Sequence, residues 1–249
     1  MVIGPSISGY AYDGIHLPLK NSPPSLEFWF GTDELGRDVF TRVWYGARIS
    51  LCVGLLAALI DLGVGLIWGG VAGLVGGLVD EGLMRLADIL YSLPYLLLVI
   101  LLTVVLGSGL TSMLAALTLT GWITMARIVR GQILLLKEMD YVMAARALGA
   151  SRARLLCVHL LPNAVGPIFI TLTLAVPSAI FAEAFLSFLG LGIQAPMASW
   201  GTMAHEGLSA LQFYPWRLFF PACFISLTML AFHLIGEGLK FAFDRNQEL

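Results

Sequence analysis

Ionisable residues that could act inside a membrane are few in this sequence, and two of them adjoin long apolar stretches. Asp61 is the only charged residue between Ile49 and Val79, and Glu183 directly follows the apolar stretch that ends at Ala182. A carboxylate inside an apolar span is costly to insert, so such residues are rare and mark candidate paths for substrates or ions. We therefore take Asp61 and Glu183 as candidate transport-path residues. The alternative for Asp61 is a neutral or hydrogen-bonded packing role against a neighbouring helix.

Residue patterns for catalysis, nucleotide binding or metal binding are not found in the sequence. Each of the lysines follows a leucine, so no Gly-Lys-Ser/Thr phosphate loop is present. The carboxylates Glu183 and Glu206 have no catalytic partner nearby in the sequence. The four histidines and three cysteines lack metal-ligand spacing, and the cysteines are better explained as buried free thiols. We expect no catalytic, cofactor-binding or metal-binding residue in this chain.

The composition indicates a membrane protein. Of the 249 residues, 58% are hydrophobic and only 12% are charged, and the mean hydropathy is +0.87. A soluble domain would carry about a quarter charged residues. The net charge of -2 gives no sign of a nucleic-acid partner, which would favour a basic domain. We therefore predict an all-α polytopic membrane protein.

About twenty apolar residues are enough for a helix to cross a bilayer, and the sequence predicts five such spans. The spans cover residues 49–79, 88–106, 110–133, 164–182 and 217–237. A short charged turn is predicted at 80–88, and Gly107-Ser108-Gly109 separates the second span from the third. The predicted domains are an extracytoplasmic segment at 1–46, a transmembrane domain at 47–237 and a cytoplasmic tail at 238–249.

An interfacial helix is predicted at the end of the first segment. Thr32 or Asp33 is expected to cap this helix. Trp44 and Tyr45 would lie at the lipid headgroups, and Arg42 and Arg48 would extend their charged ends toward water.

The longest polar interruption, at residues 137–163, has the pattern of a helical hairpin. A first helix is expected to open near Asp140. Gly149 then stands where a helix end needs a residue that tolerates positive φ, and Ser151 can cap a second short helix. Pro162 predicts a break, because proline cannot donate to the carbonyl four residues earlier.

This hairpin resembles the EAA loop of ABC importer permeases, in which Glu-Ala-Ala, a glycine and a Leu-Pro recur at fixed spacing. The matching residues are Ala144, Ala145, Gly149, Leu161 and Pro162. In that family the hairpin lies on the cytoplasmic face and docks into a groove of the ATPase subunit. Met143 stands where the family has its glutamate, which puts a polar contact to the ATPase in doubt. The alternative is an ordinary basic loop between membrane helices.

Two further segments resemble the C-type subunit of the dipeptide, oligopeptide and nickel importer permeases. One is GTDELGRD at 31–38. The other lies at 183–201, where the matching residues are Glu183, Ser187, Leu189, Gly190, Gly192, Pro196, Ser199, Trp200 and Gly201. Ala195 stands where a second proline is usual. On physical grounds, this glycine-broken apolar stretch is expected to be a re-entrant or interfacial segment outside the membrane.

The resemblance implies a type-I ABC importer transmembrane domain in the cell membrane. It implies a non-catalytic permease that forms a path for di- or oligopeptides with a homologous permease. Two ATPase subunits would bind ATP and Mg²⁺, and an extracytoplasmic binding protein would deliver the substrate. Alternatives are import of nickel or another small solute, a secondary transporter and an intramembrane enzyme. A secondary transporter would show an internal repeat and several charged residues near the middle of the membrane. The sequence shows no repeat, and Asp61 is the only charged residue that fits such a position.

The distribution of basic residues predicts the orientation. Candidate cytoplasmic residues are Arg127, Arg130, Lys137, Arg146, Arg152 and Arg154. The loops at 107–109 and 185–216 have no lysine or arginine, so we place them outside. This counting also places the N-terminal segment outside. Because the family has one more span at its start, we expect residues 1–5 to be the tail of a missing first helix.

Overall fold

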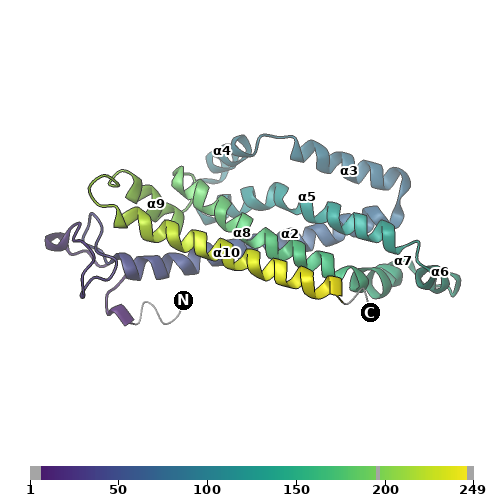
Figure 1. Ribbon diagram of the computed structural model, residues 1–249. Coiled ribbons are helices and arrows are strands. Elements are labelled where there is room, and N and C mark those ends of the chain that lie inside the picture. Colours follow the sequence, from purple (N-terminus) through teal and green to yellow (C-terminus); the bar gives the residue numbers. More distant parts are fainter. Residues whose placement is uncertain (1–6, 195–196, 246–249) are drawn as a thin grey trace. The chain divides into compact units, whose positions relative to one another are not determined.

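The computed structural model describes residues 7–194 and 197–245, and helices make up most of this part (Figure 1). The α-helices are α2 (Val39–Val75), α3 (Gly77–Tyr91), α4 (Tyr95–Leu106), α5 (Leu110–Leu136), α6 (Asp140–Ala147), α7 (Arg152–Arg154), α8 (Val165–Phe188), α9 (Trp200–Leu208) and α10 (Trp216–Arg245). The expected tail of a missing helix, at 1–5, lies outside the described residues, as do Ala195 and Pro196.

The long helices confirm the prediction of an all-α protein with several apolar spans. Four helical segments are long and apolar enough to cross a membrane: α2, α5, the continuous stretch Arg152–Phe188 and most of α10. Helices α3 and α4 qualify as a fifth span if this bent pair is counted as one. The last helix continues to Arg245, beyond the expected span end at Glu237.

The charged turn expected at 80–88 is wrong, because these residues lie within α3. The interruption is earlier, at Gly76 and Gly77, whose φ values of 70° and 55° end α2. Asp80 is accommodated in α3 by Arg130 of α5, whose Nε and Nη2 donate to its two carboxylate oxygens at 2.5 and 2.7 Å. The second span also differs from its prediction, since α4 begins only at Tyr95, directly after Pro94.

The start of α2 also differs from the expectation. The carboxylate of Asp38, rather than Thr32 or Asp33, accepts hydrogen bonds from the backbone N–H groups of Phe40 and Thr41 at 3.3 and 3.0 Å. Asp33 instead accepts from the N–H groups of Leu35 and Arg37 within the preceding loop. The carboxylate of Asp33 is used by the N–H groups of that loop, so the helix is capped by Asp38, the residue immediately before it.

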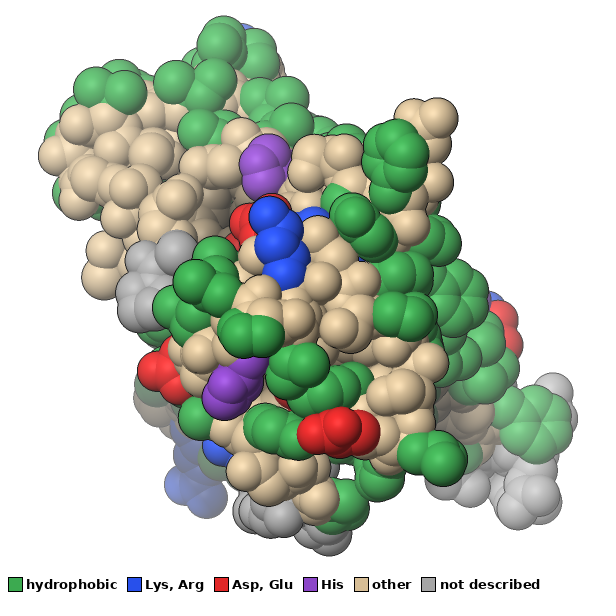
Figure 2. Space-filling view, turned by 90° about the vertical axis from the view of Figure 1, so that its left-hand side faces the viewer, with side chains coloured by type: hydrophobic (Ala, Val, Ile, Leu, Met, Phe, Trp, Pro, Cys, Tyr) green, Lys and Arg blue, Asp and Glu red, His purple; other side chains and the backbone are tan. Residues whose placement is uncertain are grey.

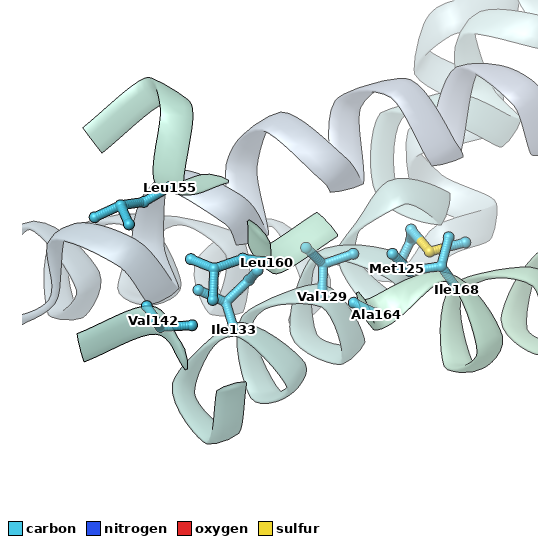
Figure 3. Packing of buried hydrophobic residues seen from close by; sticks show 8 residues of the cluster. All are labelled: Met125, Val129, Ile133, Val142, Leu155, Leu160, Ala164 and Ile168. Atoms are coloured by element: carbon cyan, nitrogen blue, oxygen red, sulfur yellow. The ribbon is translucent and has the colours of Figure 1, made fainter. Parts of the chain in front are cut away.

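The chain divides into two compact units. Unit 1 comprises residues 1–55, 98–117 and 177–231, and unit 2 comprises 56–97, 118–176 and 232–249. The core of unit 2 is a cluster of side chains from α5 to α8 (Figure 3): Met125, Val129, Ile133, Val142, Leu155, Leu160, Ala164 and Ile168. Helix α2 approaches α5 closely there, since a Cβ on Gly73 would lie 2.8 Å from the Cβ of Ile133. The glycines of α2 therefore permit close helix packing.

Candidate functional site

The predicted left-handed glycine of the hairpin in unit 2 is confirmed. Helix α6 begins at Asp140, and Gly149 has φ of 84°. The N–H of Gly149 donates to the carbonyl of Arg146 at 3.0 Å, and that of Ala150 donates to Ala145 at 3.1 Å. This pair of bonds is a Schellman motif, which satisfies carbonyls at the end of the helix. The left-handed conformation of Gly149 thus sets the turn between α6 and the second arm of the hairpin.

The second arm of the hairpin differs from its prediction. Ser151 caps it as expected, since its Oγ accepts from the N–H of Arg154 at 3.3 Å. Pro162 makes no break, however, and the chain stays helical into α8. The turns change from a π-helix at Leu155–Leu160 to a 3₁₀-helix at Leu161–Ala164. Proline lacks an N–H donor, and the change of helix type occurs where that donor is missing.

The predicted coupling residues divide between two faces of the hairpin. Ala145 and Leu161 pack against the core of unit 2, beside the fully buried Val142. Ala144 and Pro162 are exposed, and Met143 is 48% exposed. Leu148, next to the glycine, is 89% exposed. The hairpin is therefore anchored on one side and presents exposed apolar side chains, beside the exposed Arg146, on the other.

Asp61 is buried in unit 2 against α5. A Cβ on Gly121 would overlap its carboxylate, so a larger residue at 121 would displace it. Among the described residues, Asp61 Oδ1 has no hydrogen-bond partner, and neither does the buried hydroxyl of Tyr95. No sequence pattern singled out Tyr95, because the burial of its hydroxyl depends on how the chain folds.

Glu183 is fully buried in unit 1 and is the centre of a hydrogen-bond network. Its Oε2 accepts from Ser50 Oγ at 2.7 Å and its Oε1 accepts from Ser187 Oγ at 2.9 Å. Ser50 Oγ also accepts from the backbone N–H of Trp200 at 3.2 Å. The carboxylate thus joins α2, α8 and the start of α9.

A network of ion pairs around three buried arginines of unit 1, Arg37, Arg42 and Arg217, was missed by sequence reasoning. Arg42 Nη2 donates to Glu206 of α9 at 2.9 Å, and Arg37 Nε donates to Asp33 at 2.6 Å. Arg217 of α10 bonds to Glu34 at 3.1 Å. The expectation that Arg42 reaches toward water is wrong, since it is 2% exposed. The i,i+4 spacing of Asp33 and Arg37 was the only local signal.

Comparison with known proteins identifies the family. Residues 65–248 match the family of binding-protein-dependent transport system inner membrane components. The chain belongs to this family. The permease is 57% identical to the oligopeptide transport system permease protein OppC of Bacillus subtilis, over 98% of this chain and 80% of that protein. It is 59% identical to the dipeptide transport system permease protein DppC of the same organism, over 98% and 76%.

Solved structures confirm the fold of the permease. A chain of the inward-facing MetNI methionine ABC transporter matches with a TM-score of 0.67. The match covers 81% of this permease and 95% of that chain, at 16% identity. The chain therefore has the fold of an ABC importer transmembrane domain.

The described part of the permease has no cluster of three or more His, Cys, Asp or Glu residues that could hold a metal ion. Two of its buried carboxylates, Glu183 and Asp33, accept hydrogen bonds from a serine hydroxyl and an arginine. The arrangement is suited to positioning helices in a membrane.

Proposed function

We propose that this permease imports di- or oligopeptides through the cytoplasmic membrane. It works with a homologous permease, two ATPase subunits and an extracytoplasmic binding protein. The proposal is supported by 57% and 59% identity, over nearly the whole chain, to permeases named for oligopeptide and dipeptide transport. Residues 47–237 would form the transmembrane domain, with 1–46 outside and 238–249 in the cytoplasm.

The hairpin at 137–163 is the proposed coupling element. Its inner face packs on the core of unit 2, so a force on α6 is passed to α5 and α8 rather than lost in a flexible loop. Its outer face, with Met143, Ala144 and Leu148, suits an apolar groove of an ATPase. Met143 would replace a polar contact by an apolar one. ATP and Mg²⁺ would bind to the ATPase subunits, and the permease itself would be non-catalytic.

The two candidate transport-path residues, Asp61 and Glu183, have separate roles in this proposal. Asp61 keeps an oxygen without a partner among the described residues, so it is the better candidate to exchange contacts during transport. Both oxygens of Glu183 accept hydrogen bonds from serines. Glu183 would therefore support the transport path by holding α9 against α2 and α8.

Purification of the complex through a tag on this permease tests the proposal. We expect a second permease and two ATPases to co-purify, and proteoliposomes with the binding protein to take up labelled di- and oligopeptides on addition of ATP. Isolation without an ATPase, or a complex that transports no peptide, would refute the proposed function.

A further inference from the structure

A pocket of about 280 Å³ is formed in unit 1 by the segment before α2 and by the first turn of that helix. Its wall includes Tyr10, Leu26, Glu27, Trp29, Asp38 and Phe40. The pocket lies within the segment that precedes the apolar spans. On the face that carries this segment and α9, hydrophobic side chains cover much of the surface among scattered charges (Figure 2).

The aromatic walls of the pocket are held in place by their own contacts. The indole N–H of Trp29 donates to the carbonyl of Leu26 at 3.1 Å, and its ring meets Phe40 edge-on at 4.8 Å. The ring of Tyr10 lies 5.1 Å from that of Phe28. The pocket is therefore largely preformed, which lowers the entropy lost when a ligand binds.

The charged side chains that line the pocket are all acidic. Glu27 and Asp38 line it, and none of the described lining residues is lysine or arginine. Asp38 is occupied in capping α2, whereas Glu27 is exposed and accepts from the hydroxyl of Tyr10 at 2.9 Å. This hydrogen bond to the Glu27 carboxylate raises the pKa of Tyr10. Glu27 thus offers an anchored carboxylate beside aromatic faces and the exposed Leu26.

This combination fits a cation on an apolar stem. Aromatic faces attract ammonium and guanidinium groups, and the stems of lysine and arginine pack along apolar surface while the charged end reaches a carboxylate. An anion would be repelled by Glu27 and Asp38, and a purely apolar group would gain no electrostatic attraction from them.

We propose that the pocket receives a lysine or arginine side chain of the binding protein when that protein docks on the permease. The inference rests on the proposed function. A binding protein fits because transport systems of this family depend on one, and because the distribution of basic residues predicts that this segment lies on the outer side.

The test uses the assembled transporter in proteoliposomes, with the substrate-loaded binding protein titrated against ATPase activity. Glu27→Gln should raise the half-saturating concentration of binding protein about tenfold, because one charge-assisted contact is lost. Glu27→Lys should raise it further. The difference from wild type should shrink in high salt, which screens exposed charges. Asp13→Asn is the matched control, since Asp13 is exposed in the same segment and does not line the pocket.

Equal half-saturation for wild type and Glu27→Gln, or an equal shift for Asp13→Asn, would overturn the inference. So would stimulation of ATPase activity by free trilysine in the absence of binding protein, if Glu27→Gln abolished that stimulation, because the occupant would then be a free peptide. If wild-type transporter takes up no peptide, the proposed function fails. If it does and Glu27→Gln changes nothing, only the pocket assignment fails.

Discussion

At the scale of single residues, Arg42 illustrates how a buried charge constrains its surroundings. Removal of one partner from a buried ion pair leaves the other charge uncompensated, which typically costs about 3–5 kcal/mol. Arg42 pairs with both Asp33 and Glu206, at 3.5 and 2.9 Å. We expect Arg42→Met to destabilise the permease by about 3 kcal/mol, at the low end of this range, because each of these carboxylates keeps Arg37 as a partner. The measurement is thermal unfolding of the purified complex.

The matched control is Arg127→Met. Arg127 pairs with Asp88 at 2.7 Å, but the two side chains are 42% and 60% exposed. Arg127→Met should therefore lower the stability of the permease by less than about 1 kcal/mol. Equal losses for the two variants would show that the buried network of unit 1 does not contribute as inferred.

Asp61 gives a second prediction at the scale of residues. Asp61→Asn keeps the shape of the side chain but removes its charge. We expect peptide uptake to fall at least about tenfold while the complex still assembles, because a role in transport needs the carboxylate. Full uptake by Asp61→Asn at several pH values would reduce Asp61 to packing against Gly121.

At the scale of elements, the hairpin depends on the backbone of Gly149. Apart from its chain neighbours, no heavy atom lies within 4 Å of a Cβ built there, so the main cost of a substitution is the strain of positive φ, about 1–2 kcal/mol. We expect Gly149→Val to leave the spans inserted and the second permease bound. The ATPases should dissociate or hydrolyse ATP without moving peptide. Reconstituted uptake and substrate-stimulated ATPase activity measure this.

Gly131 of α5 provides the control for that prediction. Apart from the neighbouring backbone of its own helix, nothing lies within 4 Å of a Cβ built on Gly131, but this glycine lies inside a regular helix. Gly131→Val should therefore retain coupling. If Gly149→Val retains both uptake and stimulated ATPase activity, the hairpin is not the coupling element.

Local signals explain which elements were predictable. The end of α6 was predicted because a glycine and its neighbours determine it. The charged turn at 80–88 was wrong because Asp80 is stabilised in a helix by Arg130, fifty residues away. The break predicted at Pro162 was also wrong, because composition does not reveal that the helix continues by changing from π to 3₁₀ turns.

At the scale of the whole molecule, apolar composition and span lengths predicted the all-α membrane fold. The buried contacts of unit 1 could not be predicted in this way, because Arg42 and Glu206 are 164 residues apart and only the fold brings them together. The same holds for Ser50 and Glu183, which are 133 residues apart. Sequence reasoning therefore found the candidate carboxylate Glu183 but not its distant partner Ser50.

The orientation of the whole chain is the last prediction. Basic residues are concentrated between Arg127 and Arg154, which favours a cytoplasmic hairpin and an external N-terminal segment. In a functional variant whose Cys52, Cys157 and Cys223 are replaced by alanine, we would introduce Lys20→Cys or Ala153→Cys, both at exposed positions. A membrane-impermeant maleimide should label residue 20 in cells with an accessible outer face, and residue 153 only after the membrane is opened. Labelling of residue 153 from outside, in a variant that still takes up peptide, would reverse the orientation and remove the hairpin from the reach of an ATPase.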